Sequence, residues 1–206
     1  ISDEEEIARV TPVIEALKKE FDVPVSLDTY KSGVAKAGIE AGADLINDIW
    51  GFKYDPTLAA VAAEYQVPCV LMHNRNNQNY QNLMTDIISD LQESIDIALK
   101  ADISKDAIIL DPGIGFGKTV AQNFALLARQ AELLQAGYPL LLGWSRKSSI
   151  GAALQGDAAE PPPPAARVTG SVAAALMAVE RGAAIVRVHD VRETVQALQV
   201  LAAVRA

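Results

Sequence analysis

The sequence predicts an α/β fold built on a parallel sheet, and more narrowly a TIM-type (β/α)8 barrel of which this chain carries six of the eight strand-helix units. Three observations lead to that prediction. Six short, unbroken apolar runs recur along the chain, segments with helical periodicity separate them, and each run ends in a polar side chain. Unbroken hydrophobicity is typical of strands buried on both faces, as in parallel sheets covered by helices.

The six predicted strands are short and rich in valine, isoleucine and leucine. In chain order they are "VPVSLDT" from Val23, "ADLINDI" from Ala43, "VPCVLMH" from Val67, "AIILDPG" from Ala107, "YPLLLGWS" from Tyr138 and "AAIVRVHD" from Ala183. A helix fits between each strand and the next, and this alternation predicts right-handed crossovers in a parallel sheet.

A helix is also predicted before the first strand, at residues 3–20. Its apolar face carries Ile7, Val10, Ile14 and Leu17, and the spacing of Ser2 and Glu5 is that of a capping box. The other helices are predicted at residues 31–42, 55–66, 82–100, 121–136, 166–181 and 191–205. Several of them end at glycine, as helices often do.

The polar strand ends decide between a barrel and an open, doubly wound sheet. They are Asp28, Asn47, His73, Asp111, Ser145, Arg187 and His189. In a barrel all carboxyl ends of the strands meet on one face, whereas an open sheet uses chiefly the ends beside its switch point. The many polar ends therefore favour the barrel. Because six strands do not close it, two strands and one helix are expected before Ile1, and residues 1–206 are predicted to form a single domain that is incomplete at its N-terminus.

The composition limits the classes of partner. The 206 residues are 50% hydrophobic and carry a net charge of −8, which argues against general binding to nucleic acid or to an anionic membrane. The apolar runs are far shorter than the ~20 residues of a membrane span. The single cysteine, Cys69, excludes an internal disulfide framework and fits a reducing cytoplasm, where we expect the protein.

The stretch "AIILDPGIGFGKTVAQN", residues 107–123, looks like a phosphate-binding loop but lacks the spacing. A Walker A loop needs a glycine five residues before Gly117, where the chain has Pro112. A dinucleotide-binding fingerprint needs its third glycine where the chain has Lys118. The remaining candidate is Asp111, at the end of an apolar strand. Lys118 is expected to start the next helix and to contribute little.

A low-complexity segment, "GDAAEPPPPAAR" from Gly156 to Arg167, interrupts the alternation. Successive prolines donate to neither helix nor ladder and favour an extended polyproline conformation. The segment is therefore predicted to be an exposed spacer, with a proline-binding partner as the alternative.

Asp28, Asn47 and Asp111 form a first set of candidate binding residues. An ionised carboxylate only accepts, so it pairs well with adjacent N–H donors such as those of a 2-amino-4-oxopyrimidine ring, whereas an amide both donates and accepts. The trio therefore suits a flat, nitrogen-rich heterocycle. The alternative for any one of them is that it caps the following helix.

Two basic segments form a second set. "GWSRKSSIG" places four polar residues at a turn from strand to helix, where free backbone N–H groups favour an anion: Ser145, Arg146, Lys147 and Ser148. A basic surface loop is the alternative. In "RVHD", Arg187 and His189 are two residues apart and so point to the same side of a strand, which suits a diphosphate. An unpaired arginine buried in "AIVRV" would be costly, which also points to a ligand.

Six motifs in this order resemble those of the dihydropteroate synthases, the pterin-binding (β/α)8 enzymes of folate synthesis. They are "VSLDTYK", "INDI", "LMH", "LDPGIGFGK", "GWSRKS" and "RVHDVRET", and the resemblance covers essentially the whole chain. It implies a transferase that joins 4-aminobenzoate to the C9 methylene of 6-hydroxymethyl-7,8-dihydropterin diphosphate and releases diphosphate. Mg²⁺ is the implied cofactor, and the family is the target of sulfonamides.

The same resemblance implies the roles of individual residues. Those that hold the pterin ring are Asp28, Asn47, Asp111 and Lys147, with Arg187 stacking on the ring. Arg187 and His189 bind the diphosphate, whereas Phe116, Lys147 and Ser148 lie near 4-aminobenzoate. Catalysis would come from Lys147, Arg187 and His189, which stabilise charge on the departing diphosphate, with no covalent nucleophile.

The resemblance also has gaps. The family's metal-contacting asparagine lies on its first strand, which has no counterpart in this sequence, so none of these residues is expected to bind the metal. Small-molecule substrates are the implied partners, with neither nucleic acid nor membrane, and a homodimer is left open. Two alternatives remain: a pterin-binding methyltransferase that uses methyltetrahydrofolate and a corrinoid protein, and a non-catalytic pterin-binding paralogue. The basic "SRKS" and "RVH" segments favour the synthase over both.

Overall fold

The computed structural model describes residues 1–205 and divides into two compact units. Unit 1 consists of Ile1–Asn74 with Ser89–Leu110, and unit 2 consists of Arg75–Ile88 with the chain from Asp111 onward. The order of elements alternates strands with helices throughout, so the predicted α/β class is confirmed.

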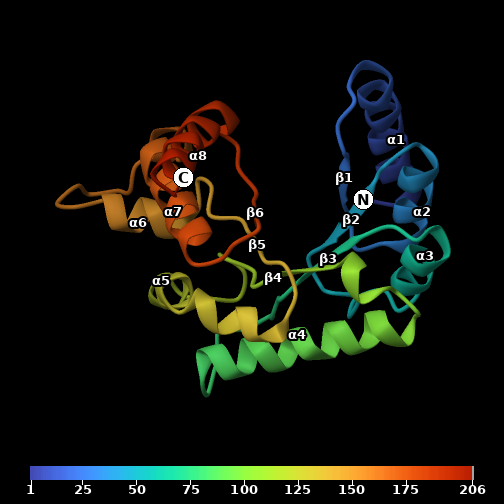
Figure 1. Cartoon of the computed structure of the whole chain (residues 1–206), viewed down its shortest axis with the longest axis horizontal. Helices are drawn as coiled ribbons and strands as arrows, with labels where there is room; N and C mark the ends of the chain where they lie inside the picture. Colours follow the sequence, from blue (N-terminus) through green and yellow to red (C-terminus); the bar gives the residue numbers. More distant parts are fainter. Residues whose placement is uncertain (206) are drawn as a thin grey trace. The chain divides into compact units, whose positions relative to one another are not determined.

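Unit 1 contains a parallel sheet with its helices in sequence order. Its elements are α1 (Asp3–Glu20), β1 (Ser26–Asp28), α2 (Ser32–Glu40), β2 (Leu45–Asp48), α3 (Leu58–Tyr65), β3 (Cys69–Met72), the greater part of α4 (Leu83–Lys100), the 3-10 turn η1 (Lys105–Ala107) and β4 (Ile108–Asp111), whose last residue belongs to unit 2. The strand order is β1-β2-β3-β4. Figure 1 shows α1, α2 and α3 in succession beside β1, β2 and β3.

Unit 2 contains a second, smaller parallel sheet. Its elements are α5 (Val120–Ala128), the 3-10 helix η2 (Gln130–Ala136), β5 (Leu141–Leu142), α6 (Ser148–Leu154), the 3-10 turn η3 (Pro164–Arg167), α7 (Val168–Glu180), β6 (Ile185–Val186) and α8 (Val191–Arg205). Strands β5 and β6 pair in parallel, and α7 and α8 lie side by side (Figure 1). Among residues 1–205 the strand pairings thus form one four-stranded and one two-stranded sheet rather than a closed barrel.

Apolar packing joins α1 to the sheet of unit 1. Ile14 is buried against Leu27 of β1 and Ala43, as the predicted apolar face of this helix requires. Gly38 lets α2 approach the same cluster closely, because a Cβ atom at Gly38 would lie 2.2 Å from the Leu27 Cδ2 atom. Leu17, predicted on the same helix face, is 37% exposed and so lies at the edge of the cluster.

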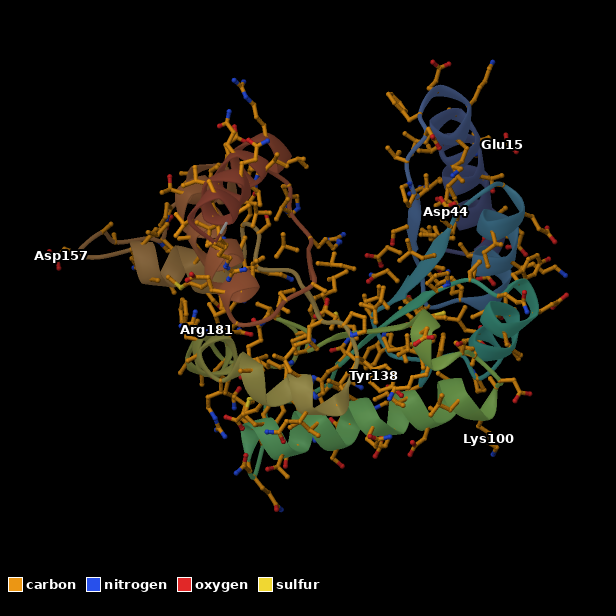
Figure 2. All side chains as sticks on the ribbon, in the orientation of Figure 1. Glu15, Asp44, Lys100, Tyr138, Asp157 and Arg181 are labelled. Atoms are coloured by element: carbon orange, nitrogen blue, oxygen red, sulfur yellow. The ribbon has the colours of Figure 1, made fainter. Side chains whose placement is uncertain are left out.

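A carboxylate holds the start of β1. The Asp44 side chain, labelled in Figure 2, accepts from the Val25 backbone N–H at 2.6 Å and from the Lys18 ammonium at 3.0 Å. These two donors lower the pKa of Asp44, the backbone hydrogen bond most strongly. The end of α1 and the loop before β2 are thereby tied to the strand whose last residue is Asp28.

Three predicted elements of unit 2 differ from what is observed. The helix predicted at 121–136 is α only to Ala128 and continues as η2, in which the Gln130 side chain is fully buried. The Gln130 Nε2 atom donates to the carbonyl of Ala178 at 2.9 Å, near the end of α7, and this hydrogen bond links η2 to the C-terminal end of that helix. The last two predicted strands shrink to two residues each.

The proline-rich segment is an exposed loop, as predicted, and Asp157 near its tip is labelled in Figure 2. Its end is tied down, because the guanidinium of Arg167 donates to the carbonyls of Pro162 at 2.8 Å and Arg146 at 3.0 Å. Pro164 starts η3, where a proline is well accommodated.

None of the helices in residues 1–205 combines the length and the apolarity that crossing a membrane would require.

Candidate functional site

Asp28 and Asn47 lie side by side at the ends of β1 and β2. The two residues are register partners in the parallel pair, so their side chains share a face of the sheet. Asn47 is buried, whereas Asp28 is exposed. The capping alternative is wrong for both, because the N-cap residues of α2 and α3 are Lys31 and Thr57.

The neighbour of Asn47, Asp48, is a structural carboxylate that the sequence did not single out. It is 1% exposed and accepts from the backbone N–H groups of Trp50 at 2.8 Å and Phe52 at 2.6 Å. Burial is the main cause that raises its pKa, and these two hydrogen bonds oppose the rise. Because both carboxylate oxygens bond to the turn after β2, Asp48 shapes that turn and leaves Asn47 as the candidate ligand contact.

His73, which follows β3, is also engaged with a carboxylate. Its ring is buried, and the Nε2 atom lies 3.0 Å from an oxygen of Asp90 on α4. A buried histidine paired in this way is oriented by its partner.

Asp111, the last residue of β4, is a buried acid. It is 6% exposed, and one of its oxygens accepts from the Gly113 backbone N–H at 2.7 Å. Burial raises the pKa of Asp111 to about 6, although this hydrogen bond and the charges of Lys147, Lys118 and Arg187 all lower it. The carboxylate is thus ionised at neutral pH and lies among positive charges, as a hydrogen-bond acceptor for a flat heterocycle requires.

The glycine turn, residues 113–117, places Phe116 and Lys147 together. The Lys147 ammonium lies 4.5 Å from the centroid of the Phe116 ring, within the range of a cation–π contact. The pKa of Lys147 is lowered, with burial as the main cause, while Asp111 acts to raise it. The predicted contacts of Phe116, Lys147 and Asp111 with one ligand are therefore compatible with their positions in unit 2.

The expectation that Lys118 starts the next helix is wrong, whereas its small contribution to binding stays a prediction. α5 begins at Val120 with Thr119 as its N-cap, so Lys118 precedes the helix, and it is 6% exposed rather than on the surface. Its ammonium donates to the carbonyls of Gly113 and Phe116, each at 3.0 Å. Because the charge is directed at turn carbonyls, this geometry also argues against a phosphate at the glycine turn.

A cavity of about 440 Å³ in unit 2 gathers most of the predicted basic residues. It is lined by Gly143, Ser145, Arg146, Lys147, Pro164, Arg187 and His189. Ser148 begins α6 beside this lining and is exposed. Concentrated positive charge in a concave site suits a polyanion such as diphosphate.

The surroundings of Arg187 and His189 differ from the prediction. β6 ends at Val186, so the two residues follow the strand, and both are exposed rather than buried. The Arg187 backbone N–H still donates to the carbonyl of Leu142 at 3.0 Å, which continues the pairing with β5. The argument from the cost of a buried arginine therefore fails, and the case for Arg187 rests on its place in the cavity wall.

Ser145 and Asp190 orient two of the lining residues. The Ser145 hydroxyl oxygen accepts from the His189 backbone N–H at 3.0 Å and lies 2.9 Å from the His189 Nδ1 atom. Arg146, with a φ of 58°, makes a bidentate pair with Asp190, at 3.0 Å from Nε and 2.5 Å from the terminal nitrogen. Arg146 is thereby bonded to a carboxylate, and the lining residues best placed for an anion are Lys147, Arg187 and His189.

A magnesium ion does not fit the residues of this cavity. Mg²⁺ prefers oxygen ligands, chiefly carboxylates and waters, whereas the lining is cationic and the nearby Asp190 is paired with Arg146. Within residues 1–205 no cluster of three or more His, Cys, Asp or Glu side chains is arranged to hold a metal.

The supporting roles of several residues escaped the sequence analysis. They are Asp48, Tyr80, Lys118, Asn123 and Asp190. Only Asn123 carried a usable signal, since it is a polar residue within the apolar run "NFALLA" of α5. It is 2% exposed, accepts from the Gly115 backbone N–H at 2.9 Å and donates to the Ser149 hydroxyl at 3.0 Å.

Comparison with known proteins gives a consistent result. Residues 1–189 match the family described as pterin binding enzyme. A dihydropteroate synthase of Clostridium beijerinckii is 54% identical over 198 residues, which are 96% of this chain and 71% of that protein. Two solved structures of the dihydropteroate synthase of Xanthomonas albilineans, one with 4-aminobenzoic acid and one with 7,8-dihydropteroate, each superpose with a TM-score of 0.95. They are 42% and 43% identical, and the match covers 100% of this chain and 74% and 78% of theirs.

Proposed function

The chain belongs to the pterin-binding enzyme family, and from that premise we propose that it catalyses the dihydropteroate synthase reaction of folate biosynthesis. The amine nitrogen of 4-aminobenzoate forms a bond to the C9 methylene carbon of 6-hydroxymethyl-7,8-dihydropterin diphosphate. The bond from C9 to the diphosphate oxygen breaks, diphosphate leaves with the bonding electrons, and the amine loses one proton. The product is 7,8-dihydropteroate.

One observation carries the proposal beyond family membership: the cationic cavity of unit 2 and the buried carboxylate of Asp111 share Lys147 and Arg187 as charged neighbours. Negative charge grows on the leaving diphosphate in the transition state, and donors already in place stabilise that charge at no cost of reorganisation. Lys147, Arg187 and His189 would supply these donors. A covalent nucleophile is not needed, because the substrate amine attacks directly.

The same residues account for recognition of the substrates. Within unit 2, Asp111 would accept N–H groups of the pterin ring, and Arg187 would stack on the ring. Phe116, Lys147 and Ser148 would lie near 4-aminobenzoate, in keeping with the contact between the Phe116 ring and the Lys147 ammonium. Ionised Asp111 matches paired N–H donors in a way that an amide or a hydroxyl would not.

The wider setting is proposed on the same basis. We take a (β/α)8 barrel as the fold of the enzyme and the cytoplasm as its location, and a homodimer is the oligomer to test. Mg²⁺ is proposed to accompany the substrate on its diphosphate oxygens, since the cavity residues do not fit the ion. The corrinoid-dependent methyltransferase has less support, because it has no use for a diphosphate site, and the identity of 54% to a synthase disfavours a non-catalytic paralogue.

The test is the stoichiometry of turnover by the purified protein. Incubation with dihydropterin diphosphate and 4-aminobenzoate should release one diphosphate for each 7,8-dihydropteroate formed, both followed by chromatography. Lys147→Ala, measured in parallel, should lose this activity. Diphosphate release that does not depend on 4-aminobenzoate, or methyl transfer from methyltetrahydrofolate, would contradict the proposal.

A further inference from the structure

The glycine turn at residues 113–117 has a backbone conformation that costs considerable conformational entropy to fix. Gly113, Gly115 and Gly117 all have positive φ, at 71°, 82° and 56°. Glycine reaches this region without strain but loses much conformational entropy when it is fixed there. One backbone hydrogen bond, from the Phe116 N–H to the Gly113 carbonyl at 3.1 Å, closes the turn. Additional contacts are therefore needed to keep the turn in one conformation.

Lys118 supplies two of these contacts from inside the fold. Its ammonium spans the turn, with hydrogen bonds of 3.0 Å to the carbonyls of Gly113 and Phe116. Lysine is almost never fully buried unless it is paired, and hydrogen bonds from a charged donor are the stronger kind. Lys118 is 6% exposed, so its ammonium depends on the turn carbonyls as acceptors, and its hydrogen bonds in turn stabilise the conformation of the turn.

Two other side chains each bond to a further backbone group of the turn. Asn123 accepts from the Gly115 N–H at 2.9 Å, and the Tyr80 hydroxyl donates to the Gly117 carbonyl at 2.8 Å. None of the three anchoring residues, Lys118, Asn123 and Tyr80, is among the lining residues of the cationic cavity.

The position of the turn matters because Lys147 packs against it. A Cβ atom at Gly115 would lie 3.1 Å from the Lys147 Cδ atom, so the glycine leaves room for the lysine side chain. The next residue, Phe116, places its ring 4.5 Å from the Lys147 ammonium. A shift of the turn would therefore move both Phe116 and Lys147, and through Gly113 it would also move the donor to Asp111.

We propose that Lys118 is a positioning residue. Together with Asn123 and Tyr80 it fixes the conformation of the glycine turn, and the turn in turn positions Phe116, Lys147 and Asp111 for contact with the substrates. This role rests on the proposed function and deepens it. Lys118 touches neither substrate, and its charge serves the turn carbonyls rather than a phosphate.

The main test is Lys118→Met, which keeps an unbranched apolar side chain but removes the donors and the charge. The KM for dihydropterin diphosphate should rise about tenfold or more, the usual effect of losing a buried charge-assisted hydrogen bond. The pH below which pterin affinity falls should also rise. The reason is that Asp111 loses one of the three positive neighbours, Lys147, Lys118 and Arg187, that favour its ionised form. Lys36→Met, on the exposed face of α2, is the matched control and should change neither quantity.

Tyr80→Phe provides a second variant that keeps almost all packing. Loss of its hydroxyl should raise the same KM about threefold, as for one neutral hydrogen bond. Tyr65→Phe is the matched control, because the Tyr65 hydroxyl bonds to Glu40 on the surface of unit 1. A purely structural role would lower the melting temperature and the active fraction while leaving KM and the pH profile unchanged, and that result would overturn the positioning role.

The two proposals fail in different ways. If the unsubstituted protein binds and turns over the pterin while Lys118→Met and Tyr80→Phe match it in KM and pH profile, the positioning role is wrong and the synthase function stands. If the unsubstituted protein neither binds the pterin by calorimetry nor turns it over, the proposed function is wrong and the positioning role falls with it.

Discussion

Asp111→Asn should inactivate the protein and stabilise it at the same time. The carboxylate is buried, and burial raises its pKa to about 6 from the ordinary 3.8, in spite of one hydrogen bond and three nearby cations. An aspartate with a raised folded-state pKa destabilises the fold increasingly as pH rises from its unfolded pKa to its folded pKa. Above about pH 6 the full penalty is present, and for this difference it is about 3 kcal/mol.

Asparagine removes that penalty without losing the structural contact, since its amide oxygen can still accept from the Gly113 N–H. We expect the free energy of unfolding at pH 7 to rise by up to about 3 kcal/mol, and by about half as much at pH 5, where the wild-type carboxylate is largely protonated. Pterin affinity should fall at least about tenfold, because the amide presents an N–H to the donors of the ring.

Urea unfolding of the free protein at the two pH values measures the stability, and calorimetry with a pterin measures the affinity. Asp157→Asn, in the exposed proline-rich loop, is the matched control and should alter neither. A destabilised Asp111→Asn would refute the conclusion that burial outweighs the cations around the carboxylate. Unchanged pterin affinity would remove Asp111 from the site.

Three further predictions follow from the same geometry. Pterin affinity should be constant above about pH 6 and should fall by up to about tenfold per pH unit below it, because Asp111 becomes protonated. An affinity that stays constant down to about pH 4.5 in a calorimetric titration series would contradict that role of Asp111. Ser145→Ala removes the hydroxyl oxygen that contacts the backbone N–H and the ring of His189, so the KM for dihydropterin diphosphate should rise by about 3- to 10-fold. An unchanged KM in steady-state assays would indicate that His189 does not bind the diphosphate. Thr119→Ala breaks a reciprocal capping box with Gln122 at the start of α5 and should cost about 1 kcal/mol in urea unfolding, whereas no loss would mean that solvent replaces the cap.

Sequence patterns predicted the repeated units well, because burial on both faces of a parallel sheet leaves a strong signature in each strand. The unbroken runs that end at Asp28, Asn47 and Asp111 are strands that end at or next to those residues. The weakest predictions were the last two strands, where β6 is only Ile185–Val186 and Ile185 is 39% exposed. A hydrophobic run does not reveal how many of its residues find a partner strand.

The supporting residues were harder to predict for a different reason. Lys118 was expected to contribute little, because lysine side chains are mostly exposed. Its actual acceptors are carbonyls that converge only because the three glycines of the turn adopt positive φ. Arg146 was grouped with the anion-binding residues, but its bidentate pairing with Asp190, 44 positions away, depends on tertiary structure. Sequence periodicity carries no information on either arrangement.

The central claim is that the cationic cavity of unit 2 binds the diphosphate of the substrate. Its most direct test is calorimetry with 6-hydroxymethyl-7,8-dihydropterin and with its diphosphate, on the unsubstituted protein and on Arg187→Gln. The diphosphate should strengthen binding by about a hundredfold or more in the unsubstituted protein, the effect expected from several charge-assisted hydrogen bonds. In Arg187→Gln that gain should shrink by about tenfold or more. A gain of equal size in both proteins, or no gain in either, would contradict the claim.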